Sequence, residues 1–178
     1  MIDQERLVRI FRTMNRIRKF EEKALRLFEE NKRRGSVHLC LGQEAIPATV
    51  CSLLRKEDYI TSTHRGHGHC IAKGADLGKA MAELMGKATG VCGGRGGSQH
   101  IHWRNLYSNG VQGGIVPIAA GMALAEKQLN SGAIVTVFIG DGTMGEGAIY
   151  EAFNMASIWN LPLLVVVENN HIAQTTPA

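Results

Sequence analysis

The stretch 134–170 constrains the fold of this chain more than any other part of the sequence. An apolar run rich in β-branched residues ends in a glycine turn that carries Asp141, a helical pattern follows, and a second apolar run ends in Asn169 and Asn170. This order predicts a strand–helix–strand unit with oxygen donors at both strand ends. Ligands of open parallel sheets bind beyond the carboxyl ends of the strands. We therefore expect Asp141 and the two asparagines on one edge of a sheet, close to a ligand.

The rest of the sequence alternates helical patterns with β-rich runs, which indicates an α/β domain with an open, mostly parallel sheet flanked by helices. Apolar residues three and four apart predict a long amphipathic helix over 3–31, with Asp3 as its N-cap, within an N-terminal helical segment, 1–35. The whole chain, 1–178, is expected to be a single domain. Further elements are expected as helices at 44–54 and 115–129 and as a strand at 58–63. One or two short helices, broken at Gly74 and near Gly78, are expected over 71–88.

Composition and charge narrow the class of protein. With 44% apolar and 20% charged residues in 178, the chain is expected to be one globular domain with a sizeable core. Much of the net charge of +4 comes from the first helix, where acids follow at once, which favours a solvated or partner-facing helix side over a nucleic-acid interface. No apolar run approaches the roughly 18 residues that span a bilayer.

The cysteine pattern and the charged beginning of the chain point to a cytoplasmic protein. The first 30 residues are too charged for a signal peptide, and no two of the four cysteines form a Cys-x-x-Cys pair that would indicate a zinc ribbon. A reducing cytoplasm is therefore expected. Only eight residues follow Asn170, so we expect a fragment, or one piece of an assembly that another chain completes.

A histidine-rich turn, 64–69, follows the strand predicted at 58–63. Its two glycines let the backbone approach a ligand, and Arg65 offers a planar guanidinium suited to phosphate or carboxylate. The histidines at positions 64, 67 and 69 could ligate a transition metal or donate hydrogen bonds to an anion. The arginine among them favours the anion, because a guanidinium repels a metal ion. A turn without a special role is the remaining alternative.

A long glycine-rich loop, 90–102, lacks the Gly-Lys-Ser/Thr ending of a P-loop. The residues after it, 103–105, are expected to continue as loop. Two alternatives remain open for this segment, a flexible lid and a loop ordered by a ligand. A second glycine turn, 107–114, leads into the helix predicted at 115–129.

The turn after the first apolar run matches the spacing of a dinucleotide-binding turn through Gly140, Gly142 and Gly145. Glu168 ends the next strand, where a ribose-binding acid belongs. However, Asp141 places a negative charge where the pyrophosphate would lie. Direct contact between the two is repulsive by several kcal/mol at low effective dielectric.

A divalent cation between the carboxylate and the phosphates removes this conflict. Mg²⁺ binds oxygen ligands, usually one or two from the protein together with phosphate oxygens. Asp141 can supply a carboxylate, Asn170 an amide oxygen, and a main-chain carbonyl just beyond it a third ligand. The N-terminus of a helix after Gly142 would face the phosphates. The alternative without a ligand is an aspartate N-cap and an Asn-Asn turn.

Several blocks of the sequence resemble those of a known enzyme family. Gly140, Asp141 and Gly142, followed by the two asparagines, are similar to the thiamine-diphosphate motif. From about residue 5 onward the chain resembles the alpha subunit of the thiamine-diphosphate-dependent 2-oxo acid dehydrogenases, a group that includes pyruvate, branched-chain and acetoin dehydrogenases. The supporting blocks are 38–44, 62–69, 96–100 and 154–159. The resemblance implies the thiamine diphosphate-binding fold, with its diphosphate-binding domain incomplete at the C-terminus.

The resemblance also implies roles for single residues. Asp141 and Asn170 resemble the Mg²⁺ ligands, with the backbone carbonyl of Ile172 as the third. His38 resembles an active-site histidine near the substrate, and His100 in the glycine-rich loop is expected to face the same catalytic site. Contacts to the cofactor's diphosphate are implied for Gly142, Thr143, His64 and Arg65, and contacts to its aminopyrimidine side for Gly110 and Gln112.

The implied function is cleavage of the carbon–carbon bond next to the carbonyl of a 2-oxo acid such as pyruvate, or of acetoin, with transfer of the acyl unit to a lipoyl acyltransferase. A beta subunit, in an α₂β₂ heterotetramer, and the acyltransferase are the implied partners. The glutamate that activates the aminopyrimidine ring comes from the beta subunit in this family, so neither Glu146 nor Glu168 is assigned to it. Two other functions remain open: an NAD-dependent oxidoreductase that uses the glycine turn, and a non-catalytic fragment that only assembles with other chains.

Overall fold

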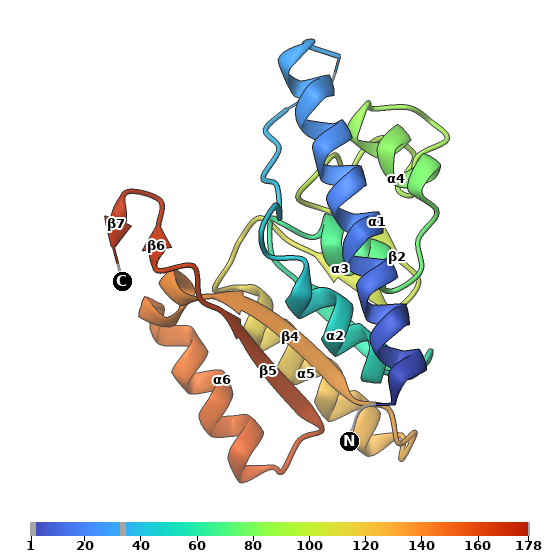
Figure 1. The fold of residues 1–178 in the computed structure, drawn as a ribbon. Coiled ribbons are helices and arrows are strands. Elements are labelled where there is room, and N and C mark those ends of the chain that lie inside the picture. Colours follow the sequence, from blue (N-terminus) through green and yellow to red (C-terminus); the bar gives the residue numbers. More distant parts are fainter. Residues whose placement is uncertain (1–2, 33–34, 178) are drawn as a thin grey trace. The chain divides into compact units, whose positions relative to one another are not determined.

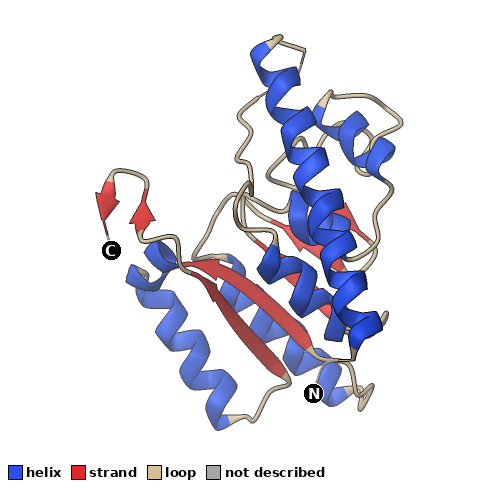
Figure 2. Ribbon diagram, in the orientation of Figure 1, coloured by secondary structure: helices blue, strands red, loops and turns tan. Residues whose placement is uncertain are grey.

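The computed structural model describes residues 3–32 and 35–177, so positions 1–2 and 33–34 of the predicted helical segment 1–35 lie outside the described residues. Figure 1 labels the elements and Figure 2 colours them by type. The elements are α1 (Gln4–Glu29), α2 (Ala45–Leu53), β1 (Tyr59–Ser62), α3 (His67–Ala72), α4 (Leu77–Leu84), β2 (His102–Trp103), β3 (Leu106–Ser108), α5 (Ile115–Gln128), β4 (Val135–Gly140), the 3-10 helix η1 (Asp141–Gly145), α6 (Gly147–Ile158), β5 (Leu163–Glu168), β6 (Ile172–Ala173) and β7 (Thr176–Pro177).

The chain divides into two compact units, each with its own core. The first contains Met1–Leu54 and His64–Ser108, and the second contains Arg55–Thr63 and Asn109–Ala178. The single domain expected over 1–178 stays a prediction. None of the helices in the described part of the chain is long and apolar enough to cross a membrane.

Helix α1 organises the first unit. Its N-cap is Asp3, whose Oδ1 accepts a hydrogen bond from the backbone N–H of Arg6 at 2.6 Å, as predicted. The apolar stripe of the helix includes Ile10, Ile17 and Phe20, which are buried in one cluster with side chains from α2, α3 and α4. Burying a side chain of this size stabilises a fold by about 1.5–3 kcal/mol.

Helices α3 and α4 divide the segment expected to be helical over 71–88. Helix α3 starts earlier than expected, at His67, inside the predicted histidine turn. Gly74, with φ of 97°, lies between α3 and α4, which confirms the break predicted there. Gly78, near which a second break was predicted, lies within α4. Asp76 then caps α4 by accepting a hydrogen bond from the N–H of Lys79 at 2.8 Å.

A short hairpin stands where 103–105 were expected to continue as loop. Strands β2 and β3 pair antiparallel, with His102 opposite Tyr107 and Trp103 opposite Leu106. The prediction holds for Arg104 and Asn105, which form the turn of the hairpin. It was wrong for Trp103, because strands this short give no alternating pattern in the sequence.

The second unit is a parallel sheet with two helices on one of its faces. Strand β4 pairs in parallel with both β1 and β5, which confirms the predicted α/β class. Val135, Val137 and Ile139 share one face of β4 and are buried in a cluster with side chains of α5 and α6. Figure 1 labels these two helices and the strand. Helix α5 contributes Ala119 and Ala123, whose small side chains let the helix pack closely against the sheet.

Candidate cofactor-binding site

Asp141 directly follows strand β4 in the second unit. The register pairs Gly140 with Glu168, so the residues after β4 and β5 leave the sheet at the same edge. Asp141 Oδ1 lies 3.3 Å from the backbone nitrogen of Asn170, which donates to it. The sequence-based prediction that Asp141 and Asn170 meet at one edge is thus confirmed.

The second carboxylate oxygen of Asp141 is the distinctive atom of this edge. Oδ2 is buried and accepts no hydrogen bond from any described residue. An unsatisfied buried polar group costs about 1–3 kcal/mol, and more when it is charged. A lone buried carboxylate oxygen of this kind suits a cation.

The two asparagines beyond β5 fold back on their own backbone. Asn169 Oδ1 accepts from the N–H of His171 at 2.8 Å, and Asn170 Oδ1 accepts from the N–H of Ile172 at 3.1 Å. These Asx turns are the Asn-Asn turn that the sequence offered as the ligand-free alternative. They also hold both amide oxygens at the sheet edge. His171 lies between the turns with φ of 62°.

The segment around Ile172 lies against the turn that carries Asp141. Strand β6 contacts η1, and a side chain at Gly142 would collide with the Cβ of Ala173. Glycine at 142 is therefore required by close packing of the backbone. Thr143 is buried beside it.

The turn that carries Gly142 forms a 3-10 helix before α6 begins. Residues Asp141–Gly145 form the 3-10 helix η1, and α6 starts only at Gly147. Between them Glu146 is extended, with its carboxylate packed where a Cβ of Gly113 would lie. The helical pattern predicted after the glycine turn is thus confirmed as α6, but the turn lacks the immediate helix start of a dinucleotide fingerprint.

The glycine turn with Gly110 and Gln112 belongs to the same edge. The N–H of Asn109 donates to the carbonyl of Ser62, the last residue of β1, at 3.0 Å. Because β1 runs parallel to β4, this turn leaves the sheet at the edge where Asp141 lies. The Gln112 amide donates to the carbonyl oxygens of Asn109 and Gly110, each at 3.2 Å.

The donor set of this edge fits Mg²⁺ better than a transition metal. It consists of one carboxylate, an amide oxygen and main-chain carbonyls, which are hard oxygen ligands. Among residues 3–32 and 35–177, no three His, Cys, Asp or Glu side chains are grouped so that they could hold a metal ion.

The first unit brings together three of the predicted residues. The rings of His38 and His64 meet edge to face, with centroids 4.6 Å apart and planes at 89°. Arg65 Nη1 donates to the carbonyl oxygen of Leu39, which ties the segment 38–40 to the start of the histidine-rich turn. Burial lowers the pKa of His38, and the positive charge of Arg65 lowers it further.

His67 and His69 differ from His64 in that both are almost completely buried within α3. His67 Nδ1 lies 3.1 Å from Oε1 of Glu21, and its Nε2 lies 3.0 Å from the hydroxyl of Ser98. Since a carboxylate only accepts, Nδ1 carries the proton, and Nε2 accepts from Ser98. This is the order of groups in a hydrolase triad, but the serine is 3% exposed and no substrate can reach it.

Sequence reasoning missed Glu83 of α4, which is fully buried. Its carboxylate accepts hydrogen bonds from four backbone N–H groups of the glycine-rich loop. His100, placed in the site by the resemblance, is exposed at the end of this loop. A signal for Glu83 existed: it lies next to Leu84 on the apolar side of a short helix, just before a loop with many unpaired N–H groups.

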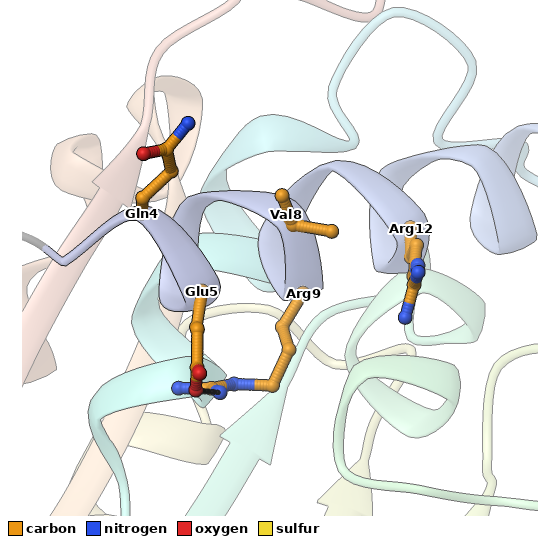
Figure 3. Close-up of a pocket in the computed structure, with 5 residues that line it drawn as sticks. All are labelled: Gln4, Glu5, Val8, Arg9 and Arg12. Atoms are coloured by element: carbon orange, nitrogen blue, oxygen red, sulfur yellow. Dashed lines mark hydrogen bonds and ion pairs between the residues drawn. The ribbon is translucent and has the colours of Figure 1, made fainter.

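A surface hollow is lined by a separate set of residues. It has a volume of about 550 Å³ and is lined by Gln4, Glu5, Val8, Arg9 and Arg12 of the first turns of α1 (Figure 3). Glu5 and Arg9 form an exposed ion pair across it at 3.5 Å. Exposed pairs of this kind contribute little, about 0.2–1 kcal/mol. None of the predicted site residues lines this hollow.

Comparison with known proteins places the chain in a family. The family model described as the dehydrogenase E1 component matches residues 12–178. The chain belongs to the dehydrogenase E1 component family. This agrees with the resemblance on which the residue roles were based.

Relatives within the E1 family are similar to the chain along almost its whole length. It is 45% identical, over 99% of its residues, to the alpha subunit of acetoin:2,6-dichlorophenolindophenol oxidoreductase of Bacillus subtilis (strain 168). It is 40% identical, over 97% of its residues, to the alpha subunit of the pyruvate dehydrogenase E1 component of Rickettsia prowazekii. In both cases the chain covers 54% of the relative, so it spans about half the length of these proteins.

A solved structure supports the fold of this E1 family chain. A thiamin diphosphate-dependent enzyme isolated from Mycobacterium smegmatis superimposes with a TM-score of 0.51, at 17% identity. The match covers 76% of this chain and 22% of that structure. At this identity the likeness concerns the fold alone.

Proposed function

We propose that this chain is the cofactor-binding part of the alpha subunit of a thiamine-diphosphate-dependent dehydrogenase acting on a 2-oxo acid, such as pyruvate, or on acetoin. The observation that carries the proposal is the buried Oδ2 of Asp141, which has no partner among the described residues and lies at the carboxyl edge of the sheet beside Asn170. Mg²⁺ bound there would neutralise the carboxylate and link it to a diphosphate.

The metal ligands in this proposal are Asp141, Asn170 and the main-chain carbonyl of Ile172. Asn170 is already oriented by its hydrogen bond to the N–H of Ile172, so little ordering is needed when a metal binds. Gly142 and Thr143 would contact the diphosphate, and Gly110 and Gln112 the aminopyrimidine side. Thiamine diphosphate, when bound, supplies the carbon–carbon bond cleavage, while the protein orients it.

The residues of the first unit are assigned to anion binding and to proton transfer. Arg65 and His64 would bind phosphate oxygens, and His38 and His100 would act near the substrate. The lowered pKa of His38 keeps its ring neutral near pH 7, so that it can both accept and donate a proton. A half-buried imidazole with this property suits a general acid–base role.

The partners in the proposal are a beta subunit and a lipoyl acyltransferase. The relatives' names identify them as alpha subunits, which supports a partner chain. We assign the activating glutamate to the beta subunit, in an α₂β₂ assembly in the cytoplasm. Glu146 packs against Gly113 and Glu168 is buried at the end of β5, and neither is given that role.

Cofactor titration tests the proposal. In the full chain assembled with its beta subunit, thiamine diphosphate binding measured by calorimetry should require Mg²⁺ and be abolished by EDTA. Asp141→Ala and Asn170→Ala should weaken it by about 100-fold. Asn169→Ala is the matched control, because Asn169 forms the same kind of turn, and it should change binding by less than about 3-fold.

The two other functions predict different results. NADH binding that is indifferent to EDTA would replace the proposal by the oxidoreductase alternative. An assembled complex that binds the cofactor but turns over neither pyruvate, branched-chain 2-oxo acids nor acetoin would favour a non-catalytic chain. The same substrate panel identifies the substrate class, because turnover is compared within one preparation.

A further inference from the structure

The glycine-rich loop is folded around a carboxylate of the protein itself. Glu83 Oε2 accepts from the N–H groups of Cys92 at 2.7 Å and Gly94 at 2.9 Å. Its Oε1 accepts from Gly96 at 2.7 Å and Gly97 at 3.1 Å. Successive N–H groups that converge in this way form an anion-binding nest. Here the anion is a side chain from the neighbouring helix.

The glycines of the loop are explained by this arrangement. A Cβ at Gly90 would collide with Glu83 itself, and a Cβ at Gly94 with the backbone of Gly86 and Lys87. Gly94 also has φ of 76°, a conformation that L residues rarely adopt. The glycines therefore allow the backbone to close on the carboxylate, which is a structural reason for a sequence that resembles a phosphate loop.

A second contact holds the far end of the loop. The Ser98 hydroxyl is bound by His67, which is bound in turn by Glu21 of α1. All three side chains are buried. The loop is thus held at two points by helices of its own unit, and these contacts argue for a loop that is ordered by the protein itself.

We propose that Glu83 is a positioning residue that holds the loop 90–98, and the adjoining His100, in one conformation before any cofactor binds. His100 follows directly, with its N–H donating to the carbonyl of Gly96 at 3.2 Å. The next residue, Ile101, donates to the Ser108 hydroxyl at 2.8 Å. Only the consequence for turnover rests on the proposed function; the order of the loop does not.

Glu83→Gln tests the inference without changing the size of the side chain. Each carboxylate oxygen accepts two N–H groups, so the glutamine NH₂ faces two donors in either orientation. Glu83→Asp keeps the negative charge but shortens the side chain by one methylene. It should therefore partly preserve the order of the loop. Glu29→Gln is the matched control, because Glu29 is exposed at the end of α1 in the same unit.

Two probes report the loop directly in the full chain assembled with its partner subunit. Thiol labelling of Cys92 and tryptic cleavage after Arg95 should each be about 10- to 100-fold faster in Glu83→Gln. Cys51 on α2, resolved from Cys92 by peptide mass mapping, should label at an unchanged rate. Burial and the Glu83 charge both raise the pKa of Cys92, so labelling is compared as the limiting rate at high pH.

Turnover separates a positioning role from a general loss of structure. With the complex active, Glu83→Gln should lower kcat by about 10-fold while the Mg²⁺-dependent affinity for thiamine diphosphate changes by less than about 3-fold. Glu83→Asp should lie between wild type and Glu83→Gln in all three readouts. Glu29→Gln should match wild type.

The outcomes distinguish the two proposals. Wild-type labelling and cleavage rates in a folded Glu83→Gln protein would overturn the inference about Glu83. If that variant does not fold, Glu83→Asp carries the test, and a loop as protected as wild type would overturn it. If the loop opens in Glu83→Gln as expected but the wild-type protein binds no thiamine diphosphate, the inference about Glu83 is supported and the proposed function is overturned.

Discussion

Two glycine-rich segments of this chain each lie beside a carboxylate, and the two carboxylates differ in the hydrogen bonds that they accept. In the first unit the loop 90–98 gives four backbone N–H groups to Glu83, two for each oxygen. In the second unit the turn after β4 leaves Asp141 with one hydrogen bond to Oδ1 and none from the described residues to the buried Oδ2. The first carboxylate is fully hydrogen-bonded within its unit, and the second has a buried oxygen without such a partner, where we propose that a cation binds. Glycine content alone does not separate the two cases; the number of N–H groups that reach each oxygen does.

The largest expected effect on stability is at Glu83. Glu83→Gln should lower the free energy of unfolding by about 2–4 kcal/mol, because two N–H donors are left facing another donor. Asp141→Asn is the same change in the other segment and, without metal, should not lower the free energy of unfolding, because it removes the charge from an oxygen that no described N–H reaches. Urea unfolding followed by circular dichroism measures both. Equal destabilisation by the two variants would break the comparison.

Adding the ligand should reverse the order of the two variants, because Asp141→Asn should then lose more stability relative to wild type than Glu83→Gln gains or loses from the ligand. Mg²⁺ with thiamine diphosphate at about 100 times Kd should stabilise wild type by about 2.7 kcal/mol. Glu83→Gln should keep most of this gain, whereas Asp141→Asn should lose it. Thermal unfolding of the assembled complex with and without EDTA measures the difference. A gain that survives Asp141→Asn would mean that the cation binds elsewhere.

Acid should weaken the Glu83 anchor. Burial raises the pKa of Glu83, but the four N–H donors outweigh it, so the pKa lies below the ordinary value of 4.5. A depressed folded pKa means that the stabilisation is complete above the unfolded value and is lost as pH falls through the folded pKa. The stability difference between wild type and Glu83→Gln should therefore shrink below about pH 4. Other carboxylates, such as Glu44, titrate equally in both proteins and cancel. A difference independent of pH would argue against an ionised Glu83.

The smallest expected effect concerns the second anchor of the loop. Ser98→Ala removes a single hydrogen bond to His67 and should cost about 1 kcal/mol in the free energy of unfolding. Ser157→Ala on the exposed side of α6 is the control and should be neutral or stabilising by a few tenths of a kcal/mol. If Ser98→Ala lowered the free energy of unfolding as much as Glu83→Gln, the contacts of His67 with Glu21 and Ser98, and not the Glu83 carboxylate, would hold the loop.

The sequence predicts the second unit well because its signals are local. The β-branched run before Gly140 and the helical pattern after it specify a strand–helix–strand unit, and parallel pairing then brings Asp141 to Asn170. The 3-10 helix between β4 and α6 and the contact of Glu146 with Gly113 were not predictable, and that contact joins residues more than thirty positions apart in the chain.

The first unit was harder to predict because its polar contacts join distant residues. His67 meets Glu21 across 46 positions and Ser98 across 31. A run of three histidines therefore seemed to be one ligand-facing turn, although His64 lies against His38 and the other two are buried in α3. Glu83 was missed for the opposite reason, since a charged residue in a short helix is usually solvated.

The filled nest of the glycine-rich loop also bears on how such motifs are searched for. The four N–H dipoles already face a negative charge, so their positive potential toward the solvent is largely cancelled. These four groups are therefore not free to bind a phosphate. A search for clustered glycines alone would predict a nucleotide-binding loop at 90–97. A phosphate mimic designed for this loop would find these four N–H groups already bound to Glu83. Asking first whether an acid in the preceding helix can reach the loop would remove such false positives.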